Sequence, residues 1–150
     1  MLNASTLFTV FVLSASTAVQ AAPEPCHFLD KPLAMALFDR WNQSLQSGDA
    51  EKVAALYTAD AVLLPTVSNT PRTDHDGKVD YFKHFIANKP VGRIDSSTLI
   101  ASCNGAIDTG TYTFRFQDNS TIQARYTFSY AWVDDQWLIT SHHSSAVPEA

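Results

Sequence analysis

The hydrophobic periodicity of this chain changes at Pro90, and that change constrains the fold more than any other feature of the sequence. Before Pro90, apolar residues recur at intervals of three and four, the spacing that places them on one face of a helix. After Pro90 they alternate with polar residues, in stretches rich in Thr, Tyr, Phe, Ile and Trp that are typical of strands. Helices first and an antiparallel meander last predict an α+β fold, with about three N-terminal helices packed on a curved, mostly antiparallel sheet.

Capping residues and helix breakers mark the ends of the expected elements. Asp30 is placed to cap the first helix, Pro32 sits in its first turn, and Gly48 ends it. A curved sheet wrapped on helices leaves a cone whose open end is a natural pocket. The expected helices cover residues 30–48, a short segment after Asp49, and about 74–88; the expected strands cover 61–66, 99–103, 109–117, 121–133 and 136–145.

The first 21 residues predict a secretory signal peptide, followed by one domain over residues 22–150. An apolar run from Leu7 to Leu13 is followed by small residues and by Val19 and Ala21, which fit the positions read by a signal peptidase. A membrane anchor is the alternative, but this run is shorter than the roughly 20 residues that cross a bilayer. We therefore expect a periplasmic or secreted protein that has no membrane attachment after cleavage.

Two cysteines, Cys26 and Cys103, lie in the part of the chain that remains after cleavage. An even count in an oxidising compartment suggests that they form a disulfide, and two unpaired thiols are the alternative. Nothing in the sequence resembles the paired Cys and His spacing of a metal site, so we expect no metal and no cofactor.

The strands after Pro90 divide their side chains between two faces, and the turn at residues 134–135 sets the pairing. With a two-residue turn there, Thr127 faces His142 and Arg125 faces Ser144, and opposed residues share a face. A two-residue turn before Thr121 adds two aromatic residues to this surface, which we call the Arg125 face. Its candidate ligand-binding residues are Arg125, Thr127, His142, Ser144, Tyr112 and Phe114.

The sequence alone does not decide whether the Arg125 face looks into the cone. We favour that orientation, because a guanidinium among hydroxyl and aromatic side chains offers planar paired donors to a carboxylate or phosphate. The alternative is an exposed arginine, with the opposite, aromatic-rich face forming the core.

Several stretches resemble the nuclear transport factor 2-like (NTF2-like) superfamily, and most closely the association domain of calcium/calmodulin-dependent protein kinase II and its stand-alone bacterial relatives. They are residues 38–49, 55–65, 124–132 and 137–145, followed by Pro148 and Glu149. The resemblance implies a cone-shaped fold, a dimer or ring of dimers, and a deep pocket that holds arginine. Arg125 matches one buried arginine of the kinase domain, whereas Ser144 stands where the kinase has another. Since the chain has no Gly-rich nucleotide loop and no His-Arg-Asp string, we expect no kinase activity.

These observations predict a non-catalytic domain that binds a small, anionic, partly apolar molecule and associates with itself through an apolar outer sheet face. The formal net charge of −5 disfavours nucleic acid as a partner. The alternative function is a small cofactor-free isomerase, dehydratase or cyclase, with His142 as base and Tyr112 or Arg125 stabilising an oxyanion. A third interpretation is a structural homodimer whose cone is filled by side chains, which the volume of the pocket would distinguish.

Overall fold

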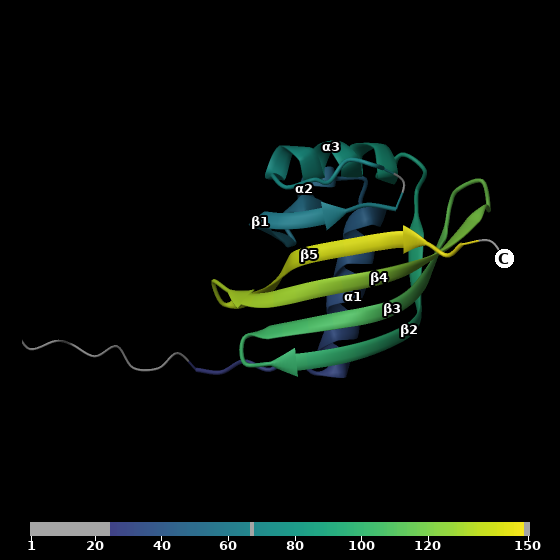
Figure 1. The fold of residues 1–150 in the computed structure, drawn as a ribbon. Helices are drawn as coiled ribbons and strands as arrows, with labels where there is room; N and C mark the ends of the chain where they lie inside the picture. The colour runs from purple at the N-terminus through teal and green to yellow at the C-terminus, as the bar shows by residue number, and fades with distance from the viewer. Residues whose placement is uncertain (1–24, 67, 149–150) are drawn as a thin grey trace, which may run out of the picture.

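The computed structural model describes residues 25–66 and 68–148, in which helices cover one face of a five-stranded sheet (Figure 1). This arrangement confirms the predicted α+β fold. The helices are α1 (Lys31–Gln46), α2 (Ala50–Ala54) and α3 (His75–Ile86); the strands are β1 (Tyr57–Leu64), β2 (Val91–Ser102), β3 (Gly105–Arg115), β4 (Thr121–Val133) and β5 (Gln136–Ala146).

The strand order in the sheet is β1-β5-β4-β3-β2. Neighbouring strands from β2 to β5 are antiparallel, as the meander predicted, and β1 joins β5 in parallel. Helix α1 crosses behind the sheet, whereas α2 and α3 lie beyond its β1 edge (Figure 1). The sheet therefore has one covered face, which we call the inner face, and one outer face.

Side-chain caps start each helix at the residue that the sequence indicates. The Asp30 carboxylate accepts a hydrogen bond from the Leu33 backbone N–H at 2.9 Å, which satisfies one of the free donors of the first turn. Asp49 caps α2 and Asp74 caps α3 in the same way. The apolar stripe of α1 is buried against the sheet, as its spacing predicts, and consists of Ala34, Phe38, Trp41 and Leu45.

Aromatic side chains fill most of the space between α1 and the inner face of the sheet. The Trp41 ring lies edge-on to Phe114 and Phe128, with ring centroids 6.1 and 5.8 Å apart. Phe82 of α3 approaches the same indole at 6.3 Å. Edge-to-face packing of this kind stabilises a core beyond the area it buries, by about 0.5–1.5 kcal/mol per pair.

Three strands begin earlier than the sequence indicates, among them β3, which starts at Gly105 rather than at residue 109. β1 begins at Tyr57 rather than at residue 61, and β2 begins at Val91 rather than at residue 99. The early part of β2 is rich in polar residues because it is an edge strand with much of its surface in water. It is nevertheless paired with β3 over almost its whole length, so cross-strand hydrogen bonding determines its structure there.

The predicted disulfide between Cys26 and Cys103 is confirmed, with the two Cα atoms 5.1 Å apart. It fastens the segment before α1 to the turn between β2 and β3. Two hydrogen bonds reinforce the link, from the Asn104 N–H to the His27 carbonyl at 2.9 Å and from the His27 N–H to the Asn104 side chain at 2.8 Å. The predicted signal peptide lies outside the described residues, and none of the described helices is long and apolar enough to cross a membrane.

Candidate functional site

The connection between β3 and β4 separates Tyr112 and Phe114 from Arg125. Arg115 pairs with Thr121, so the connection has five residues, 116–120, rather than two. This difference of three residues reverses which face each β3 side chain occupies, because side chains alternate along a strand. Tyr112 therefore lies opposite Ala124 on the inner face, whereas Arg125 pairs with Thr111 on the outer face.

A bulge in β5 moves His142 and Ser144 to the inner face. Tyr130 pairs with Ile139, but Ser129 pairs with Ser141, so Thr140 has no partner of its own. The extra residue shifts the register by one, which places His142 opposite Phe128 and Ser144 opposite Tyr126.

The prediction that Arg125 and Thr127 line the cone is therefore wrong. The bulge pairs Thr127 with His143 and Arg125 with Ser145, all on the outer face. Arg125 is exposed, and its guanidinium donates a long hydrogen bond, 3.4 Å, to the Ala146 carbonyl. The other four candidate residues, Tyr112, Phe114, His142 and Ser144, are buried together inside.

The buried side chains on the inner face form a directional chain of hydrogen bonds. The Trp41 indole N–H, which can only donate, donates to the Tyr57 hydroxyl at 3.0 Å. The Tyr57 hydroxyl is then free to donate its own proton to His142 Nδ1, also at 3.0 Å. With Nδ1 as acceptor, a neutral His142 carries its proton on Nε2.

The chain continues from His142 toward the end of β1. His142 Nε2 lies 3.4 Å from the Tyr112 hydroxyl, which donates onward to Ser144 Oγ, and Ser144 contacts the hydroxyl of Thr66. Burial lowers the pKa of His142 to about 3, with a smaller contribution from His143. Burial likewise raises the pKa of Tyr112 above its usual range. The hydrogen-bonded side chains from Trp41 to Ser144 are therefore uncharged at neutral pH. The cavity beside them measures about 10 Å³.

A much larger hollow, of about 910 Å³, lies beyond these hydrogen-bonded side chains, at the mouth of the cone. We call it the mouth groove. One wall comes from α3 and the loop before it, and the other from the hairpin between β3 and β4. Tyr81 and Phe85 line both the mouth groove and the small inner cavity, so their rings form part of the partition between them.

Arg72 supplies the positive charge of the mouth groove. Its Nη1 lies 3.0 Å from the Asp80 carboxylate on α3, and its backbone forms a two-bond bridge with Leu63 of β1. The Nε of Arg72 is buried and has no hydrogen-bond partner among the described residues. Because a guanidinium has five N–H donors, Arg72 keeps donating capacity beyond its pair with Asp80.

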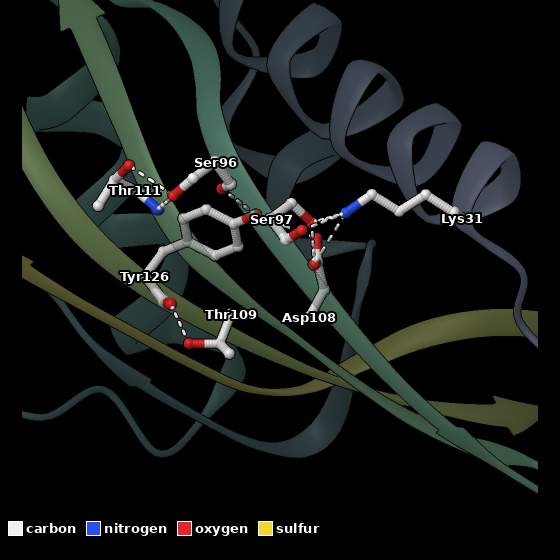
Figure 2. A network of polar contacts seen from close by, with 7 residues as sticks. All are labelled: Lys31, Ser96, Ser97, Asp108, Thr109, Thr111 and Tyr126. Carbon is white, nitrogen blue, oxygen red and sulfur yellow. Dashed lines mark hydrogen bonds and ion pairs between the residues drawn. The ribbon is translucent and has the colours of Figure 1, made fainter.

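A second buried polar cluster lies beneath the β2 edge, centred on Asp108 (Figure 2). The Tyr126 hydroxyl donates to one carboxylate oxygen at 3.1 Å, and Ser97 donates to the other. Lys31, in the first turn of α1, lies 4.0 Å from Asp108 and donates to the Ser97 carbonyl at 2.8 Å. This cluster joins the start of α1 to the sheet, and its contacts satisfy the buried charge.

The centre of the outer face is polar, contrary to the expectation of an apolar surface. A shallow depression of about 550 Å³ is lined largely by hydroxyl side chains. Exposed apolar side chains on this face lie nearer its margins, for example Ile100 and Ile107, which pair across β2 and β3. The polar lining includes Thr109, Thr111, Arg125, Thr127, His143 and Ser145.

Residues 32–148 match the family described as calcium/calmodulin dependent protein kinase II association domain. The chain belongs to this association-domain family. The predicted resemblance is therefore confirmed. A candidate association domain of this type from Xanthomonas campestris shares 46% identity, with a TM-score of 0.75 over 78% of this chain and 87% of that chain. No curated protein matches the sequence.

More distant structures share the fold of this association domain. An NTF2-like protein of unknown function from Pseudomonas putida KT2440 has 18% identity and a TM-score of 0.69, over 79% of this chain and 87% of that chain. A candidate dehydratase of the NTF2-like family from Streptomyces avermitilis has 15% identity and a TM-score of 0.68, over 77% and 94%. At these identities the likeness establishes the fold alone.

The predicted site residues include none of those that line the mouth groove of this association domain, and Arg72 and Tyr81 illustrate why. Arg72 lies in a proline-containing loop, where periodicity carries no information about side-chain direction. Tyr81 precedes Phe85 by four residues on α3, a spacing that does indicate a shared helix face.

In the part of the chain that the structure describes, no three His, Cys, Asp or Glu side chains are grouped to hold a metal ion.

Proposed function

We propose that this association domain is a non-catalytic module that associates with itself and binds a small anionic molecule in the mouth groove. The observation that carries the proposal is the groove itself, which combines an arginine with spare donors and aromatic walls in about 910 Å³. Pockets of this size are typical of small-molecule sites. The disulfide supports action in an oxidising compartment, periplasmic or extracellular.

In this proposal Arg72 takes the role that the sequence analysis assigned to Arg125. A carboxylate in the groove would accept hydrogen bonds from the guanidinium, and the apolar part of the ligand would pack on Tyr81, Phe85 and Phe116. The buried Nε–H of Arg72 lacks an acceptor, so a ligand oxygen that reached it would also satisfy a desolvated donor.

Binding is favoured over catalysis by the surroundings of His142. An isomerase, dehydratase or cyclase that used this imidazole as base would need its substrate beside the ring. Both ring nitrogens lie within hydrogen-bond distance of tyrosine hydroxyls, and the adjoining cavity of about 10 Å³ is smaller than any substrate. His142, Tyr112 and Ser144 would then support the pocket from behind rather than touch the ligand.

Thermal-shift measurements with a panel of small carboxylates test the binding site. We expect the melting temperature of the wild type to rise with ligand, Arg72→Lys to weaken the effect because an ammonium lacks the planar fork, and Arg72→Ala to abolish it. Arg93→Ala is the matched control, since Arg93 is exposed on β2 outside the groove. Equal shifts in all four proteins would refute the assignment.

Self-association follows from the family and is proposed to use the outer face, which no described helix covers. We expect light scattering to give at least a dimer at micromolar concentration. Thr127→Arg, at the polar centre of that face, should lower the mass by placing like charges against each other. Thr73→Arg, in the exposed segment before α3, should leave it unchanged. A monomer mass for the wild type would contradict self-association, and an unchanged mass for Thr127→Arg would exclude this face.

A further inference from the structure

The two walls of the mouth groove carry opposite charge. On the α3 wall, the positive charge of Arg72 is paired with Asp80. On the hairpin wall, Asp118 carries a negative charge that has no cationic partner among the described ion pairs. The arginine and the two carboxylates therefore give the groove a net charge of about −1 at a pH where imidazoles are neutral.

Asp118 is held in place and kept ionised by its own hairpin. Its Oδ1 accepts hydrogen bonds from the Ser120 N–H at 2.9 Å and from the Ser120 hydroxyl at 2.6 Å. These bonds lower the pKa of the Asp118 carboxyl. Both use the same oxygen, so Oδ2 keeps its capacity to accept from a ligand.

Aromatic side chains supply the apolar surface of the groove. Tyr81 and Phe85 stack along α3, with ring centroids 5.8 Å apart and planes 14° apart. Phe116, the first residue after β3, meets Phe85 edge-on at 6.2 Å and 89°. The two rings at right angles form a corner that fits a planar apolar body.

We infer that the mouth groove takes an amphoteric ligand, a small molecule with a carboxylate, an amine and an apolar or aromatic body. The inference rests on the proposed function, since it takes the groove as the ligand site and Arg72 as the carboxylate partner. The amine is what this inference adds to the carboxylate and the apolar part of the proposed ligand. A purely anionic ligand would meet Arg72 but would also be repelled by Asp80 and Asp118, whereas an ammonium group beside Asp118 turns one repulsion into an ion pair.

Three probes that share one ring separate the two charge contacts: phenylalanine carries both groups, 3-phenylpropanoate only the carboxylate, and 2-phenylethylamine only the amine. We expect calorimetric titration at pH 8 and low salt to show phenylalanine binding about three- to fivefold more tightly than 3-phenylpropanoate, the scale of an exposed ion pair. Asp118→Asn should bring that ratio to about one. Arg72→Gln should weaken phenylalanine and 3-phenylpropanoate together. It should not weaken 2-phenylethylamine, because the change removes a cation and frees the Asp80 carboxylate.

Asp76→Asn is the matched control, because Asp76 is an exposed carboxylate of α3 that does not line the groove. It should leave the phenylalanine preference intact. If 3-phenylpropanoate binds at least as tightly as phenylalanine and still depends on Arg72, the amphoteric ligand is refuted while the anion site stands. A phenylalanine preference that survives Asp118→Asn also refutes it. Absence of binding by all three probes overturns the groove as a ligand site as well.

Discussion

Acidification to pH 5 is expected to destabilise this protein through His142. The imidazole is fully buried, and its pKa in the folded protein is lowered to about 3 from an ordinary value of 6.5. Between these two values the unfolded chain binds a proton at this residue and the folded protein does not, so the free energy of unfolding falls as the pH falls. Below about pH 3 both states are protonated and the loss stops growing.

The size of the loss follows from the separation of the two pKa values. A pH of 5 lies about 1.5 units below the pKa of the imidazole in the unfolded chain. This difference corresponds to a free energy of unfolding about 2 kcal/mol lower than at pH 8. The full separation of about 3.5 units sets an upper limit near 5 kcal/mol. Most carboxylates stay ionised at pH 5, so His142 should dominate the change between pH 8 and pH 5.

Urea unfolding at pH 8 and pH 5 measures this loss in the wild type and two variants. His142→Gln keeps an acceptor and a donor beside Tyr57 and Tyr112 but does not titrate, so it should be less stable at pH 8 and lose little on acidification. His143→Gln, at the exposed neighbouring position, should lose as much as the wild type. If His142→Gln loses as much as the wild type, the reasoning is refuted. Should that variant not fold, nitrogen NMR that shows a charged His142 at pH 5 would refute it equally.

Two further perturbations test the contacts that anchor the start of the domain. Reducing the bond between Cys26 and Cys103 should lower the free energy of unfolding by about 2–5 kcal/mol, measured by thermal melts with and without reductant; unchanged melting would show that the link carries no stability. Lys31→Met leaves the buried Asp108 without its cation and should cost about 1–3 kcal/mol in urea unfolding, whereas Lys52→Met, in an exposed pair, should cost under about 1 kcal/mol. Equal costs would contradict a special role for the buried carboxylate.

Local signals predicted the helices and most of the strands. Asp30, Asp49 and Asp74 cap helices because a short acidic side chain satisfies backbone donors within its own turn. The spacing of Phe38 and Trp41 placed both in the core, since a helix fixes its faces within a few residues. These interactions involve neighbours in sequence, so the sequence determines them without reference to the rest of the fold.

Only the tertiary structure shows which face of the sheet each strand side chain occupies. Whether Tyr112 shares a face with Arg125 depends on the number of residues in one hairpin connection, and whether His142 points inward depends on one unpaired residue, Thr140. The connection is three residues longer than expected, and β5 has one extra residue. An odd number of added residues moves side chains to the other face of the sheet, while the alternation of apolar and polar residues along each strand looks the same. The pattern of apolar and polar residues in β5 is too polar to reveal the bulge.

The sequence by itself determined that this chain would form an α+β cone with a disulfide at its N-terminal end, because caps, periodicity and cysteine count act locally or by composition. Only the tertiary structure decided that side chains fill the closed end of the cone while its mouth stays open, and that Arg125 lies outside it. It also decided that Arg72 meets Asp80 and the aromatic rings of α3 at the mouth. The physical reason is that a strand's inward face is set by what it packs against, and the partners of Arg72 and Arg125 come from segments that only folding brings together.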